Sequence, residues 1–94
     1  MGLQFEWDEK KAQSNLRKHG ISFEEATTAF GDTLSITIDD PLHSQDEDRL
    51  ILIGLSEALK TLVVVHVEKR DTVRIISARK ASKNEKQFYE ENRL

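Results

Sequence analysis

The chain has 94 residues, of which 33% are charged and 37% hydrophobic, and its net charge at pH 7 is −3. This length and composition predict a single domain over residues 1–94 and exclude an intrinsically disordered chain. The sequence contains no cysteine, which excludes disulfides, a thiolate nucleophile and a zinc–thiolate site.

Two short helices are predicted in the first third of the chain. Asp8 is placed to cap the N-terminus of the first helix, and Gly20 supplies the left-handed residue that ends it. Ser22 and Glu25 have the spacing of a capping box, so a second helix of about two turns should follow and end near Gly31. The few residues before Asp8 are expected to be extended.

After the second helix the hydrophobic period changes from 3.6 to 2. Residues 34–39 alternate apolar and polar side chains as a half-buried strand does, and the apolar run at 49–55 predicts a central strand. A polar loop at 40–48 separates them. Residues 60–68 and 72–79, joined by a short turn, predict a hairpin. Short connections favour antiparallel neighbours, so a four-stranded antiparallel sheet is expected.

The C-terminal segment predicts a third helix. Ser82 and Glu85 repeat the capping-box spacing, and Phe88 and Tyr89 are placed to anchor the helix to the sheet. The fold class is therefore α+β, with two N-terminal helices, a four-stranded antiparallel sheet and a C-terminal helix. We expect the helices to cover one face of the sheet and leave the other face open.

No membrane partner is expected. The longest apolar stretch, residues 61–67, is too short to span a bilayer, and the N-terminus lacks the pattern of a signal peptide. These features predict a cytoplasmic protein.

The charges are unevenly distributed along the chain. Residues 24–57 contain nine acidic residues and one arginine, a balance of −8, whereas residues 60–86 contain eight basic and three acidic residues, a balance of +5. A local basic surface can bind phosphate while an acidic surface faces a basic partner. The alternative is that both segments are solvated faces without a partner.

Ionisable residues lie within the predicted hairpin, where a small protein needs apolar side chains. His66 and Glu68 share one face of their strand because strand side chains alternate. If the valines of the other face lie under the helices, His66 and Glu68 face solvent; these valines are Val63, Val65 and Val67.

The arginine that accompanies His66 depends on the register of the hairpin. Arg74 and Arg79 lie on opposite faces of a regular strand, and a slip of one residue exchanges them. Arg79 is preferred because Ser77 would share its face and make that face more polar.

Such a face has the groups that metal-free RNA cleavage requires. His66 can act as general base or acid near neutral pH, Glu68 can orient it or share that role, and Arg79 can stabilise charge on the phosphoryl oxygens. Further candidates to bind RNA phosphates are basic: Arg49, Arg74, Lys80 and Lys18. No cofactor and no metal site are predicted, because the acidic loop around His43 matches no known pattern of metal ligands.

Each residue also has a purely structural interpretation. His66 can be a hydrogen-bonded core residue, and Glu68 can simply flank the turn. Arg74 and Arg79 can pair with the acidic loop, and Lys18 can complement the dipole at the end of its helix.

Three ordered blocks of the sequence resemble the BrnT family of toxins from bacterial type II toxin–antitoxin systems. They are "FEWDEKKAQSNLRKHGISFEEA", "VVVHVE" and "RIISARKASKNEKQFYE", and the resemblance extends from Phe5 to about Tyr89. The resemblance implies an α+β fold related to the RelE-type ribonuclease toxins and cleavage of RNA that halts translation. It also implies a BrnA-like antitoxin partner, through which the toxin would contact operator DNA only indirectly.

The resemblance also points to individual positions. The matching positions are Lys18, His19, Arg49, His66, Arg74, Arg79 and Tyr89. RelE-like toxins typically combine basic residues with a tyrosine, so Tyr89 or Lys80 is an alternative acid–base group. A second hypothesis is a non-catalytic interaction subunit that modulates the binding of an antitoxin to its operator.

Overall fold

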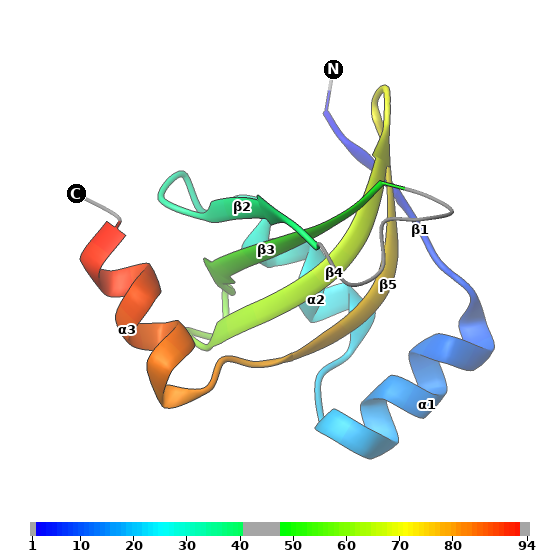
Figure 1. Ribbon diagram of the computed structural model, residues 1–94. Coiled ribbons are helices and arrows are strands. Elements are labelled where there is room, and N and C mark those ends of the chain that lie inside the picture. Colours follow the sequence, from blue (N-terminus) through cyan, green and yellow to red (C-terminus); the bar gives the residue numbers. More distant parts are fainter. Residues whose placement is uncertain (1, 41–47, 93–94) are drawn as a thin grey trace.

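The computed structural model describes residues 2–40 and 48–92. The elements in chain order are β1 (Gln4–Glu6), α1 (Glu9–His19), α2 (Phe23–Ala29), β2 (Ile36–Asp39), β3 (Arg49–Leu55), β4 (Thr61–Lys69), β5 (Thr72–Lys80) and α3 (Lys83–Asn92) (Figure 1). Most of the polar loop predicted at 40–48, including His43, lies outside the described residues.

The predicted helix ends are confirmed. The Asp8 carboxylate accepts two backbone N–H groups of the first turn of α1, at 2.8 and 3.2 Å, and Gly20 ends that helix with a φ of +72°. The Ser22 hydroxyl accepts the backbone N–H of Glu25 at 3.0 Å. The Ser82–Glu85 box makes both of its reciprocal bonds, at 2.7 and 3.2 Å. These ends are local hydrogen-bonding devices, so a few neighbouring residues specify them.

The sheet has five strands in the order β1-β5-β4-β3-β2, and the last four pair antiparallel as predicted. The prediction of a four-stranded, wholly antiparallel sheet is wrong at one edge, because β1 pairs in parallel with β5. Phe5 of β1 lies beside Val73 and packs against the core, which gives this three-residue strand its apolar anchor. The α+β class is confirmed with a mixed sheet.

Helices lie on both faces of the sheet. The larger core lies under α1 and α2 and includes the fully buried Phe23, Leu62, Val64 and Ile75. α3 packs against the opposite face at one end, where Tyr89 contacts the cluster of Ile53 and Val63. The expectation that the helices cover only one face is therefore wrong for α3.

Asn15 ties α1 to the edge of β5. β1 pairs only with Thr72–Arg74, so it does not reach Ala78. The Asn15 amide occupies that place: its Nδ2 donates to the carbonyl oxygens of Ala78 (2.7 Å) and Ile21 (2.9 Å), and its Oδ1 accepts the backbone N–H of Ala78 at 3.1 Å. A buried side chain thus satisfies strand-edge groups that would otherwise be costly to bury.

A β-bulge in β5 decides which side chains share a face. Val65 pairs with Ser77 and His66 with Ile75, so Ile76 is an extra residue on β5. Arg74 and Arg79 are five positions apart and would lie on opposite faces of a regular strand. Because of the bulge, both arginines lie on the sheet face opposite α1 and α2.

Candidate functional site

His66 belongs to the core beneath α2. Its side chain is 0% exposed, and its ring lies edge-on to Phe30 with centroids 4.8 Å apart. Nδ1 donates to the carbonyl oxygen of Val64 at 3.2 Å, and Nε2 lies 2.9 Å from Oε2 of Glu68. The prediction that His66 faces solvent beside an arginine is wrong, because α1 and α2 cover the face of Leu62, Val64 and His66.

Neither candidate arginine lies on the face of His66. Arg79 is the cross-strand partner of Val63 and Arg74 that of Val67, on the opposite face. Arg79 also has a partner in α3: its Nη1 and Nη2 donate to the two carboxylate oxygens of Glu85 at 2.7 and 2.8 Å. Of the predicted catalytic set, the structure thus brings His66 and Glu68 together, as predicted, but leaves Arg79 on the other face of the sheet.

The remaining predicted residues divide in the same way. Tyr89 is 2% exposed and its hydroxyl donates to the Asp32 carboxylate, so it docks α3 instead of facing solvent. Lys80 pairs with Leu62 and thus belongs to the face of α1 and α2, while Lys18 lies in the last turn of α1. Of the predicted phosphate-binding residues, the structure brings together Arg49 and Arg74.

These two arginines belong to a row of side chains that crosses four strands, which we call the Arg74 row. It consists of Glu6 on β1, Arg74 on β5, Val67 on β4 and Arg49 on β3. Neighbouring strands are about 4.8 Å apart, so these side chains line one band across the sheet. The next row toward the β4–β5 turn contains Lys69 and Thr72.

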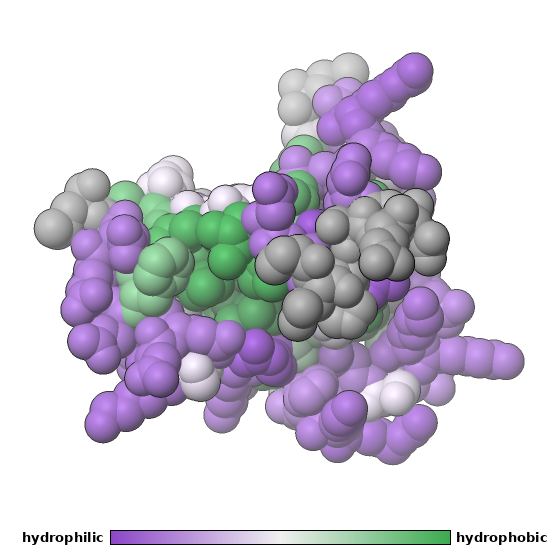
Figure 2. Space-filling model, viewed as in Figure 1, coloured by the Kyte–Doolittle hydropathy of each residue, from purple (hydrophilic) through white to green (hydrophobic). Residues whose placement is uncertain are grey.

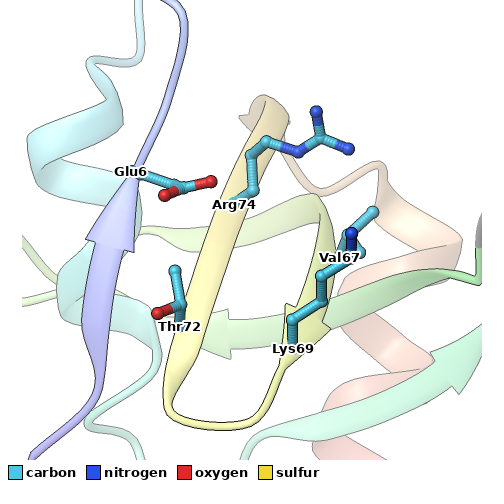
Figure 3. Close-up of a pocket in the computed structure, with 5 residues that line it drawn as sticks. All are labelled: Glu6, Val67, Lys69, Thr72 and Arg74. Carbon is cyan, nitrogen blue, oxygen red and sulfur yellow. The ribbon is translucent and has the colours of Figure 1, made fainter.

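Figure 3 shows that part of this band forms a pocket near the β4–β5 turn. The pocket has a volume of about 140 Å³ and is lined by Glu6, Val67, Lys69, Thr72 and Arg74. The Glu6 carboxylate points from β1 toward the stem of Arg74 (Figure 3). The exposed Glu6 carboxylate can accept a proton from a bound ligand. The two cations of the pocket, Arg74 and Lys69, can stabilise negative charge on the same ligand.

The sequence interpretation missed Glu6 and Lys69. Phe5 and Trp7 are half-buried whereas Glu6 is exposed, so the alternation of a strand was present in "FEW". That alternation was the signal that could have placed Glu6 on a polar sheet face. Its partner strand β5 begins 66 positions later in the chain, and no local pattern indicates that pairing.

Among residues 2–40 and 48–92, no group of three or more His, Asp or Glu side chains is placed to hold a metal ion. In the same described ranges, no helix is long and apolar enough to cross a membrane.

The Arg79–Glu85 pair predicts a pH-dependent part of the stability. Its hydrogen bonds lower the pKa of Glu85 from 4.5 to about 2 and raise the pKa of Arg79. The stabilisation should thus be complete above pH 4.5 and disappear as the pH falls toward 2. Because both side chains are partly exposed, we expect Glu85→Gln to lower the free energy of unfolding by about 1 kcal/mol at pH 7.

Urea denaturation between pH 7 and pH 2 measures this difference. The exposed Glu90→Gln in the same helix is the matched control and should change little at any pH. A difference between wild type and Glu85→Gln that stays constant down to pH 2 would contradict the linkage.

Comparisons with known proteins agree with this fold. The model of the family described as "Ribonuclease toxin, BrnT, of type II toxin-antitoxin system" matches residues 7–85. The crystal structure of the Brucella abortus ribonuclease toxin BrnT is similar with a TM-score of 0.63 and 26% sequence identity, over 86% of this chain and 99% of that chain. No curated protein sequence matches the chain.

Proposed function

Because the chain belongs to the BrnT family of ribonuclease toxins of type II toxin–antitoxin systems, we propose that it cleaves RNA in the cytoplasm and thereby inhibits translation. A cognate BrnA-like antitoxin neutralises it and provides the only contact with operator DNA. The observation that supports the nuclease proposal is the Arg74 row, in which one exposed carboxylate and two half-buried arginines lie on one face of the sheet.

The proposed reaction is a metal-independent attack of the ribose 2′-hydroxyl on the adjacent phosphorus. Glu6 takes the proton of the 2′-hydroxyl, a new O2′–P bond forms and the P–O5′ bond breaks. The leaving 5′-oxygen takes up a proton from water and Glu6 releases its proton to water, so the products are a 2′,3′-cyclic phosphate and a 5′-hydroxyl end. Arg74 and Lys69 hold the negative charge that gathers on the phosphoryl oxygens.

Arg49 extends the phosphate-binding surface beyond the pocket. It is the cross-strand partner of Val67, which separates it from Arg74 by one strand. A guanidinium fork there suits the phosphate next to the cleaved one. We assign binding, not proton transfer, to this residue.

The purified chain tests the proposal directly. We expect it to cleave single-stranded RNA in the presence of EDTA and to leave 2′,3′-cyclic phosphate ends. If Arg49, Arg74 and Lys69 each contact a phosphate, the logarithm of the RNA binding constant should fall with the logarithm of the salt concentration with a slope of about −2.

Two results would contradict this proposal. A salt slope near zero would mean that these cations do not contact the RNA backbone. Intact RNA after prolonged incubation with a natively folded chain would refute the nuclease itself.

One observation favours the second candidate function, a non-catalytic subunit that modulates antitoxin–operator binding. His66 and Arg79, two residues of the predicted catalytic set, are held by partners within the chain. A chain that binds its antitoxin and alters the antitoxin's affinity for operator DNA, yet leaves RNA intact, would establish that function.

A further inference from the structure

The sheet face that carries the Arg74 row also carries an apolar groove next to α3. The groove has a volume of about 320 Å³, and its apolar lining comes from β2, β3, β4 and α3. Figure 2 shows this area as a continuous apolar surface surrounded by hydrophilic side chains. Ile38 and Phe88 are 42% and 41% exposed at its borders, and they belong to a contiguous apolar surface, which is more informative than a single exposed apolar side chain.

We propose that this groove binds an amphipathic helix of the protein antitoxin, and that the same helix continues over the Arg74 row with acidic side chains. The inference rests on the proposed function, since a type II toxin has a protein antitoxin as its partner. It adds to that function the surface, the secondary structure and the charge pattern by which the antitoxin is recognised.

The lining of the groove favours a helix over an extended segment. Its floor consists of side chains from the middle of the sheet, among them Ile51, Ile53 and Val63, whose strands are paired on both sides; the nearest edge strand is the four-residue β2, at the border of the groove. An extended segment needs backbone partners for its own N–H and C=O groups, whereas a helix satisfies them internally. A helix can therefore lay one apolar face in the groove at no cost in unpaired backbone groups.

The register of the sheet determines the expected charge pattern. Three successive rows lie on this face: Ile53 and Val63 in the first, Ile51 and Val65 in the second, and Arg49 and Arg74 in the third. Alternate residues of a strand are about 6.7 Å apart, so the first and third rows are separated by about 13 Å. That distance corresponds to roughly nine helical residues. A helix with apolar residues followed by acidic ones matches both ends of the face.

This arrangement also explains inhibition. A helix that fills the groove and extends over the Arg74 row occupies the cations that would hold RNA phosphates. One continuous surface thus serves the substrate and the inhibitor, and the two cannot bind together.

Binding of the antitoxin encoded beside the toxin gene tests the inference, with calorimetry on the full-length purified proteins. Ile38→Glu and Phe88→Glu should each weaken binding about 30-fold or more, the effect of disrupting an apolar anchor of an interface. The matched control is Leu16→Glu, which charges a slightly more exposed apolar residue on α1, on the other side of the sheet. It should leave the affinity unchanged. Circular dichroism and thermal melting verify the fold of each variant.

The outcomes separate this inference from the nuclease proposal. If all three variants bind the antitoxin with the same affinity, the groove is not the docking surface, whether or not the chain cleaves RNA. A wild-type chain that forms a dimer dissociated by Ile38→Glu, with antitoxin affinity unchanged, would overturn it in favour of self-association. Loss of antitoxin binding in Ile38→Glu and Phe88→Glu supports the inference even if the wild type leaves RNA intact. Intact RNA would refute only the nuclease proposal.

Discussion

Glu6→Gln is expected to lower the rate of RNA cleavage about 100- to 10,000-fold, the usual contribution of one general base. The substitution keeps the shape and the hydrogen-bonding capacity of the side chain but removes the group that accepts the 2′-hydroxyl proton. RNA binding should change little, because Arg74 and Lys69 still line the pocket. Single-turnover cleavage of a labelled oligonucleotide, with binding measured separately, shows whether the loss lies in the chemical step.

Glu9→Gln is the matched control for this measurement. It removes a carboxylate only three positions away, in the first turn of α1 and outside the pocket lining. Its cleavage rate should equal that of the wild type. If Glu6→Gln also retains the wild-type rate, Glu6 is not the base, and another group near the Arg74 row must take the proton.

The sequence predicted those parts of the fold that neighbouring residues determine. Asp8, Gly20, Ser22 and Ser82 mark helix ends through contacts within a few positions, and all were placed correctly. The extended segment before Asp8 was predicted, but its place in the sheet was missed, because β1 is stabilised by pairing with β5, far along the chain, and by the packing of Phe5. A strand of three residues has too short a pattern to indicate that pairing.

The face that we propose to bind RNA could not be predicted because both faces of β4 are apolar. Leu62 and Val64 pack under α1 and α2, while Val63 packs against α3 on the other face, so alternation alone does not say which face is open. The bulge at Ile76 then moved Arg74 onto the face of Arg79. A register irregularity of one residue depends on tertiary packing, and no residue of "VRIISAR" signals it.

Several residues in the blocks that resemble the BrnT family have structural roles. Asn15 satisfies the edge of β5 at Ala78, and Ser22 caps α2. These contacts explain why the blocks identify the fold without assigning chemical roles to their individual residues. The proposed base, Glu6, lies just before the first residue matched by the family model.

His66→Ala is expected to lower the free energy of unfolding by about 3 kcal/mol, because it leaves a cavity beside Phe30 and removes the contact with Glu68. In a domain of this size, that loss should lower the melting temperature by more than about 10 °C. The rate of RNA cleavage per folded molecule should stay close to the wild-type rate, since a fully buried imidazole cannot reach a ribose hydroxyl. Thermal melting and cleavage at low temperature measure the two effects separately.

His19→Ala provides the comparison with a half-buried histidine in the last turn of α1, and it should cost less than 1 kcal/mol. The decisive quantity is the cleavage rate of folded His66→Ala. A purely structural role of His66 predicts an unchanged rate, whereas a catalytic role predicts a large loss. A rate reduced 100-fold or more in a variant that is fully folded at the assay temperature would return His66 to the catalytic set. Its burial would then require that RNA binding open the contact between Phe30 and β4. An unchanged rate would show that the imidazole is only a core residue. Proton transfer would then be the task of groups on the opposite face of the sheet.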